Sequence, residues 1–169
     1  MKRFFCISLI LSLVSIFFIS CNDKPQYSEI KEFPNQTWDR IESGKDVSFE
    51  KINITNLKDI YDINLSFNHT KDINVDEISV ILRIESPSGV KKESIHTIAL
   101  KNRDNEKFVG SDMGEVIEIK EPIKQYYTFT EKGEYKFIIS NYSSKFQIKG
   151  LRNIGIEVKK SVLDYNVEK

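Results

Sequence analysis

The sequence predicts an all-β protein, a single antiparallel β-sandwich of the jelly-roll or immunoglobulin-like kind with about eight or nine strands. Three observations predict it. Apolar and polar residues alternate in short runs, turn residues separate these runs at intervals of about ten residues, and no segment sustains a helical stripe over three turns. The chain has 169 residues, 40% of them hydrophobic, with only 7 glycines and 4 prolines. This composition is typical of one folded domain with an additional end segment.

Alternation is clearest in five segments, in which one face of each strand is expected to be buried and the other solvated. These segments are 61–67, 78–84, 135–139, 146–148 and 154–158. Weaker strand candidates are 95–100, 116–119 and 126–130. The breaks between runs carry turn chemistry, as in Pro87-Ser88-Gly89, where proline sets φ and glycine supplies a positive φ. Short strands separated in this way favour a sandwich over a helical fold.

A change of parity interrupts one further strand candidate. Val47 and Phe49 occupy one parity, whereas Ile52 and Ile54 occupy the other. All four can face the same core only if an extra residue is inserted between the two pairs. The pattern therefore predicts a β-bulge near residues 50–51.

The N-terminus resembles a bacterial lipoprotein signal peptide. Lys2 and Arg3 precede the apolar run 4–20, which is followed at once by Cys21 and a polar segment. In lipoproteins of this kind the leader is cleaved immediately before the cysteine, and the thiol carries the lipid. We therefore expect a signal peptide over residues 1–20 and membrane attachment through lipid on Cys21. The alternative is an uncleaved anchor, because the run approaches the roughly 17–25 residues that span a bilayer.

The segment after the cysteine is polar and contains two prolines, so residues 21–37 are expected to form the lipidated cysteine and a flexible tether. Residues 38–169 are then expected to form the sandwich domain. Cys6 would leave with the leader and Cys21 would carry lipid, so the domain would contain neither a free thiol nor a disulfide. The expected location is the cell envelope, at the outer membrane in preference to the inner, with the domain in the periplasm or at the cell surface.

The residue pattern indicates a binding protein rather than an enzyme. The 25 basic residues balance the 25 acidic residues, which argues against a nucleic-acid partner. His69 and His96 lack the spacing of a metal site or a catalytic triad, so both are interpreted as solvated or structural, and no cofactor or metal is expected. Two alternatives stay open. Asp72, Asp76 and Glu77 could bind Ca²⁺ around a loop, and a hydrolase could use either histidine with an acid and a hydroxyl.

Three aromatic residues are candidate partner-binding positions. Trp38 is either a stacking platform for a ligand or a buried aromatic at the rim of the core. Tyr126 and its neighbour Tyr127 should point to opposite faces of a strand, which leaves one of them exposed. Tyr142 could belong to a sugar-stacking surface. An open strand edge is a second route to a partner, by strand addition.

The C-terminal half carries a more specific pattern of glycine and aromatic residues. The two stretches read Phe129-x-x-x-Gly133-x-Tyr135-x-Phe137-x-Ile139 and Ile148-x-Gly150-Leu151-x-Asn153-Ile154-Gly155-Ile156-x-Val158-Lys159. This pattern resembles the end of the gliding motility lipoprotein GldH family of Bacteroidota. The resemblance covers nearly all of the chain after the leader. The chain departs from the family pattern at 69–72, 106–110 and 141–144, which would change any partner contacts made there.

This resemblance implies a non-catalytic accessory lipoprotein of the gliding motility and associated secretion apparatus. Its partners would be the membrane, through lipid on Cys21, and other envelope proteins. The alternative is a surface lipoprotein that binds a glycan through exposed aromatic residues.

Overall fold

The computed structural model describes residues 24–40 and 46–161, and this part of the chain contains eleven strands and one short 3-10 helix. The elements are β1 (Tyr27–Glu32), η1 (Pro34–Gln36), β2 (Thr37–Asp39), β3 (Val47–Ile54), β4 (Tyr61–Thr70), β5 (Glu77–Glu85), β6 (Lys91–Ala99), β7 (Ser111–Asp112), β8 (Val116–Tyr127), β9 (Gly133–Asn141), β10 (Gln147–Lys149) and β11 (Leu151–Lys160). Among the described residues, no helix has the length and apolar character needed to cross a bilayer.

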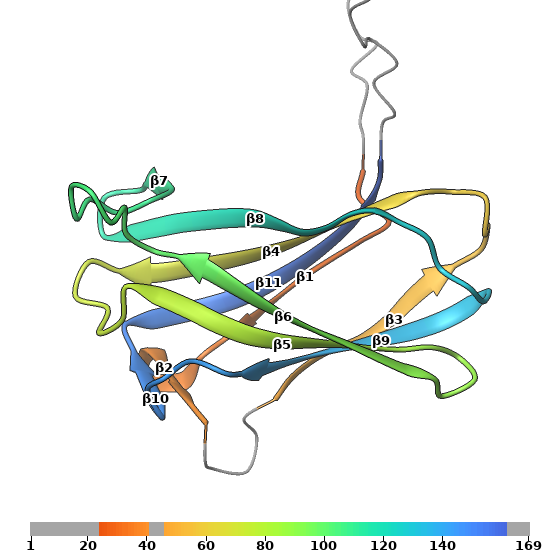
Figure 1. Ribbon diagram of the computed structural model, residues 1–169, viewed down its shortest axis with the longest axis horizontal. Coiled ribbons are helices and arrows are strands. Elements are labelled where there is room, and N and C mark those ends of the chain that lie inside the picture. Colours follow the sequence, from red (N-terminus) through yellow and green to blue (C-terminus); the bar gives the residue numbers. More distant parts are fainter. Residues whose placement is uncertain (1–23, 41–45, 162–169) are drawn as a thin grey trace, which may run out of the picture.

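Two antiparallel sheets form the sandwich (Figure 1). One sheet has the order β1-β11-β4-β8-β7, the other has the order β3-β9-β5-β6, and β10 pairs with β2 in a small third sheet. Successive long strands lie in different sheets, except β5 and β6, which are neighbours in the same sheet. This order of eight long strands in two sheets is a jelly roll. The predicted all-β sandwich is confirmed. The strand count is higher than expected because the sequence pattern missed β1 and the short strands β2 and β7.

The predicted bulge in β3 is confirmed. The register between β3 and β9 shifts between Phe49 and Ile52, so that both side chains are fully buried. Lys51 lies at the shift with a φ of 62°. A positive φ at a non-glycine residue is uncommon, and here it is part of the insertion that returns Ile52 to the core.

The domain begins earlier than expected, and the prediction of a tether over 21–37 is wrong from Tyr27 onward. Strand β1 pairs with β11 in unbroken register from Tyr27 opposite Val158 to Glu32 opposite Asn153. Its half-buried positions are Tyr27, Glu29 and Lys31, two of them charged, whereas the apolar Ile30 is 56% exposed. The weak hydrophobic signal therefore concealed the strand. The leader and Cys21 lie outside the described residues.

Two other strand assignments need correction. The candidate strand 126–130 is wrong, since Tyr126 and Tyr127 end β8 and the following residues up to Thr130 form no strand. Phe146 and Ile148 were expected on one buried face, but Phe146 precedes β10 and is 60% exposed, with the guanidinium of Arg40 over its ring at 5.5 Å.

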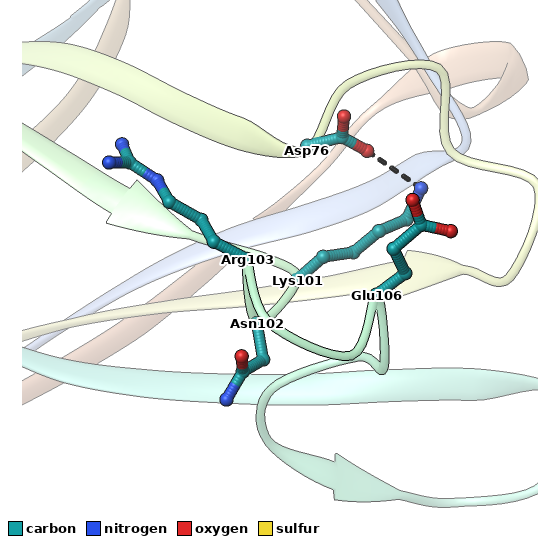
Figure 2. A pocket seen from close by; sticks show the side chains of 5 residues that line it. All are labelled: Asp76, Lys101, Asn102, Arg103 and Glu106. Carbon is teal, nitrogen blue, oxygen red and sulfur yellow. Dashed lines mark hydrogen bonds and ion pairs between the residues drawn. The ribbon is translucent and has the colours of Figure 1, made fainter.

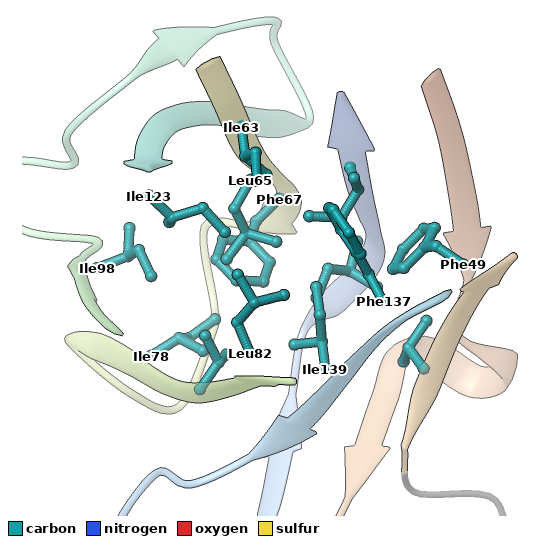
Figure 3. Close-up of a cluster of buried hydrophobic side chains, with 14 of the residues drawn as sticks. Phe49, Ile63, Leu65, Phe67, Ile78, Leu82, Ile98, Ile123, Phe137 and Ile139 are labelled. Carbon is teal, nitrogen blue, oxygen red and sulfur yellow. The ribbon is translucent and has the colours of Figure 1, made fainter. Parts of the chain in front are cut away.

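The core lies between the inner faces of the two sheets (Figure 3). Its labelled members are Phe49, Ile63, Leu65, Phe67, Ile78, Leu82, Ile98, Ile123, Phe137 and Ile139. Alternation on each strand directs these side chains inward, and full burial of each contributes roughly 1.5–3 kcal/mol to stability.

The two ends of the sandwich are closed differently. At the aromatic end, the rings of Tyr61, Tyr127 and Tyr135 surround Phe129, with centroids 5.3, 5.0 and 4.7 Å from its own. At the opposite end, the buried polar residues His69 and Asn141 lie in the last two residues of β4 and β9, and the buried Ser143 follows β9. We call this second end the histidine end.

Candidate functional site

Trp38, predicted as a possible partner-binding residue, is not available as a platform. Its side chain is only 2% exposed, and its ring stacks on Phe33 with centroids 5.2 Å apart. Strand β2 positions it opposite Ile148 of β10, against the first residues of β11. The interpretation of a buried aromatic at the rim of the core is therefore correct, and the interpretation as an exposed stacking surface is not.

Tyr126 is exposed where β8 ends. Its side chain is 60% exposed, its φ is 53°, and its backbone N–H donates to Asp62 Oδ1 over 3.1 Å. The neighbouring Tyr127 is half-buried against the core and packs edge-on against Phe129. The two adjacent tyrosines thus have opposite surroundings, as alternation predicts, and Tyr126 is the one that a partner can reach.

Tyr142 is also exposed, by 48%, and lies just after β9. Its N–H donates to the carbonyl of Ser79, near the start of β5, over 2.8 Å. Tyr126 lies instead beside the start of β4. Because a short turn joins the end of β4 to the start of β5, these two starts lie at opposite ends of the sandwich (Figure 1). Tyr126 and Tyr142 therefore do not form one shared surface.

His69 is sealed inside the protein rather than placed on a loop. It is 0% exposed near the end of β4, with Nδ1 2.9 Å from the carbonyl oxygen of Thr70 and its ring 5.3 Å from that of Phe108. Burial lowers the pKa of His69. The hydrogen bond to the Thr70 carbonyl opposes this shift, and the charge of Lys101 adds to it. The neutral ring donates through Nδ1, and Nε2 has no hydrogen-bond partner among the described residues. A histidine in this setting cannot exchange protons with a substrate.

His96 lies on the other sheet, half-buried on β6. Its Nε2 is 2.8 Å from Ser94 Oγ. Burial lowers the pKa of His96, with a smaller effect from the charge of Lys124. In the described part of the chain, the hydrogen bonds of both histidine rings go to hydroxyl or carbonyl oxygens and not to carboxylates. Neither described histidine ring therefore has the carboxylate hydrogen bond that orients the base of a Ser-His-Asp triad.

The carboxylates considered for calcium have separate partners. Asp76 pairs with Lys101 at 2.6 Å, Glu77 pairs with Arg103 at 3.5 Å, and Asp72 accepts a hydrogen bond from the Thr70 hydroxyl. Figure 2 shows the hollow of about 330 Å³ beside this loop, with Asp76 and Lys101 joined across it. Within residues 24–40 and 46–161, no group of three potential ligands is placed to hold a metal ion. The alternative calcium site is not formed.

A groove between β6 and β8 was not singled out from the sequence. Two hollows of about 360 and 260 Å³ follow one another along these strands. We call them together the β6–β8 groove. The first is lined by Ile84, Lys92, Glu93, Ser94, Lys124 and Tyr127, with the Glu93 carboxylate paired to Arg83. Residues of the second include His96, Glu121 and Pro122. In the described ranges, Lys92 and Lys124 form no ion pair, so this half of the groove is positively charged.

Ile95 lies on the outer face of β6 and is 59% exposed. It is paired across the strand with Ile81 of β5. A signal in the sequence could have identified it. Ile98 and Leu100 share one parity and are buried, whereas Ile95 has the other parity and must face solvent. A single exposed isoleucine is common on protein surfaces, so Ile95 marks a contact surface only in combination with other features of β6.

Comparison with known proteins decides the family. The family model described as GldH lipoprotein matches residues 26–158. The chain belongs to the GldH lipoprotein family. The match begins one residue before β1 and ends within β11, so the GldH region coincides with the whole jelly roll. The resemblance inferred from the C-terminal glycine and aromatic pattern is confirmed.

Two individual proteins are similar to this GldH-family chain. A protein of Christiangramia forsetii named "Gliding motility lipoprotein GldH homolog" is 27% identical over 154 residues, which cover 86% of this chain and 90% of the relative. Among solved structures, the Yersinia pseudotuberculosis-derived mitogen YPM aligns with 85% of this chain and 93% of its own at 14% identity. The TM-score of that alignment is 0.33.

Proposed function

We propose that this GldH-family protein is a lipid-anchored component of the cell envelope that assists the assembly or operation of the gliding motility and associated secretion machinery. It acts by contacting other envelope proteins and not by catalysis. The family match over residues 26–158 is the main support for this proposal. The name of the Christiangramia forsetii relative supports a role in gliding motility. The cellular site that we propose is the outer membrane, with the domain in the periplasm or at the surface.

Lipid on Cys21 would hold the domain close to the bilayer. Strand β1 begins at Tyr27, six residues after the cysteine. Six residues span at most about 20 Å when fully extended. Because β1 starts opposite Val158, at the aromatic end of the sandwich, that end would face the membrane. Tyr126 would then be available to partners near the membrane and Tyr142 to partners farther from it.

The described side chains favour protein contacts over the alternative of glycan capture. Trp38 is buried, and the exposed Tyr126 and Tyr142 lie at opposite ends of the domain. A sugar-binding surface needs an exposed aromatic face beside polar groups that satisfy the hydroxyls. The separate positions of these tyrosines suit contacts with proteins, in which single exposed aromatic residues serve as anchors.

The test compares the full-length chain with a Cys21→Ala variant in the native host. We expect the variant to lose lipid labelling and membrane retention. We also expect that it will not restore colony spreading or secretion to a deletion strain, whereas the intact gene will. A Cys6→Ala variant is the matched control, since it changes a cysteine of the leader and should behave as wild type. A deletion strain with normal spreading and secretion would overturn the proposed role. Retention of Cys21→Ala through a covalent lipid would overturn the anchor.

A further inference from the structure

The two large sheets have four edge strands, and three of them carry features that discourage further pairing. On β1, Glu29 and Lys31 face the core side and form an ion pair with each other. Strand β3 is interrupted by the bulge at Lys51. Strand β7 has two residues, and the part of β8 beyond it contains Pro122, which has no N–H to donate.

Strand β6 differs from the other three. It runs for 9 residues, and its register with β5 is unbroken from Glu85 opposite Lys91 to Glu77 opposite Ala99. No described strand pairs with its other side. Its charged residues are confined to the first three positions, and the remaining six positions carry His96 and uncharged side chains. Such an edge is a ready template for another strand.

We propose that β6 binds an extended segment of a partner protein by strand addition, and that this segment carries acidic side chains on one face and apolar side chains on the other. This inference rests on the proposed function and names the surface and the chemistry of the contact. An added strand would continue the sheet beyond β6. Its alternate side chains would lie over the outer face beside Ile95 and over the β6–β8 groove beside Lys92.

The groove side determines the charge of the partner segment. Lys92, Ser94 and His96 alternate along β6, and Lys124 faces them from β8. Glu93 does not cancel these charges, because its carboxylate is paired with Arg83 at 2.6 Å on the outer face. Lys92 and Lys124 line one hollow and have no acidic partner in the described ranges, so they favour a carboxylate between them. Glu121 lies in the second hollow, where a neutral side chain fits better.

The outer side determines the apolar character of the segment. Ile95 is 59% exposed and lies beside Ile81, so an apolar side chain of an added strand would extend this pair. A second copy of this chain is a poorer occupant. The groove-side residues of another β6 would be Lys92, Ser94 and His96 again, which place no acid beside the unpaired lysines.

The probe is a fluorescent, capped nine-residue peptide with valine on one face and two glutamates and two serines on the other. Binding to the full-length chain in detergent is followed by anisotropy. A peptide with lysines in place of the glutamates should bind at least tenfold more weakly. Two further peptides carry N-methyl groups on alternate residues in the two possible registers. Because an added strand uses one edge only, one register should bind and the other should not.

The variants locate the site. The double change Lys92→Glu with Lys124→Glu should weaken the glutamate peptide at least tenfold and strengthen the lysine peptide, and Ile95→Lys should weaken both. Lys58→Glu with Lys107→Glu is the matched control, because both lysines are exposed and lie outside the groove. An unchanged unfolding midpoint shows that a variant is folded. If a variant fails to fold, the charge and N-methyl peptides test the wild type independently.

The proposal would be overturned if the two N-methyl peptides bound equally well. It would also be overturned if the wild type and the double variant each bound the glutamate peptide and the lysine peptide with the same affinity. A third outcome would also overturn it: the chain self-associates, Ile95→Lys abolishes this self-association, and the glutamate peptide does not bind. The occupant of the β6 edge would then be a second copy of the chain. The proposed function fails separately. Its test is the phenotype of the deletion strain, which does not depend on whether β6 is the contact surface.

Discussion

The aromatic end and the histidine end lie at opposite ends of strands β4 and β9. Aromatic rings close the first end, and buried polar side chains close the second. At the aromatic end, Phe129 is 4% exposed and lies within 6.4 Å, between centroids, of four other rings. The polar groups there reach the surface or are bonded: Tyr135 Oη donates to the carbonyl of Glu131 and accepts from its N–H. Burial raises the pKa of Tyr127 in this cluster.

The histidine end is closed by polar groups that tie turns to strands. The Asn141 side chain accepts from the N–H of Ser143 over 2.9 Å, and the Ser143 hydroxyl accepts from the N–H of Ser79 over 3.0 Å. His69 Nε2 and Asn141 Nδ2 remain without hydrogen-bond partners among the described residues. Buried polar groups contribute orientation when bonded and reduce stability when left unbonded. The comparison indicates that stability is concentrated at the aromatic end and pH sensitivity at the histidine end.

The largest expected effect is at Phe129. Phe129→Ala removes the ring that contacts Tyr61, Tyr127 and Tyr135 and should lower the free energy of unfolding by about 3–5 kcal/mol. Urea denaturation measures this loss. Phe146→Ala is the control, since that ring is 60% exposed and its removal should change little. A loss at Phe129 no greater than at Phe146 would contradict the view that the aromatic end holds the fold together.

A glycine at the histidine end is expected to have the next largest effect. Gly150 has a φ of 89°, and a Cβ there would lie 2.7 Å from Thr70 Oγ1 and 2.9 Å from Ile73 Cα. Gly150→Ala should therefore lower the free energy of unfolding by about 2–3 kcal/mol. Gly89 has a similar φ of 85° with open space around it, so Gly89→Ala should cost only about 1 kcal/mol. Thermal unfolding of the two variants separates backbone strain from steric contact, and equal losses would show that contact with Ile73 is unimportant.

The pH dependence of stability should expose the histidine end. Burial holds the pKa of His69 below its ordinary value of 6.5, so protonation favours the unfolded chain. Stability should therefore fall as the pH drops below about 6.5, by at most about 1.4 kcal/mol per pH unit for one proton. Burial also lowers the pKa of His96, which contributes in the same direction.

Replacing both histidines isolates this effect. The chain has 2 histidines, so His69→Leu combined with His96→Gln should give constant stability between pH 6.5 and 5. The carboxylates with lowered pKa values, such as that of Glu157, act only as the pH falls below about their ordinary value of 4.5. If the wild type shows no fall in this window, His69 is not kept neutral by the fold.

The smallest effects are expected at the two exposed tyrosines. Tyr126→Ala at the aromatic end and Tyr142→Ala at the histidine end should each change the free energy of unfolding by no more than about 0.5 kcal/mol. Both side chains are about half exposed or more. If either variant keeps its stability but loses cross-links to envelope proteins in the native host, that end carries a partner contact. Unchanged cross-linking in both would remove these tyrosines from the list of contacts.

The sequence predicts the central strands well because their buried face is apolar and their outer face is mostly polar, which produces alternation along the chain. Tyr61 to Phe67 alternate between apolar and polar residues, and Ile78 to Ile84 do so except at Ile81. These residues lie in β4 and β5 as expected. The parity change after Phe49 predicts the bulge for the same reason. Strand β1 was missed, because an edge strand with one covered side need not alternate in hydrophobicity.

The site was less predictable than the fold. Trp38 and Tyr126 are both aromatic residues near strand ends, yet the first is buried on Phe33 and the second is exposed. Their difference depends on which distant element covers each ring. The positive half of the β6–β8 groove depends in the same way on Lys92 and Lys124, which come from different sheets.

The sequence by itself determined that this chain is an all-β member of the GldH family, because periodicity, turn residues and family motifs are local properties of the chain. Only the tertiary structure decided which edges of the two sheets are blocked and that His69 is buried. It also decided that β6 has an open edge beside two lysines without ion-pair partners among the residues it describes. These properties depend on the packing of one sheet over the other. Burial and charge pairing arise between residues that are far apart in the sequence, so no local pattern can contain them.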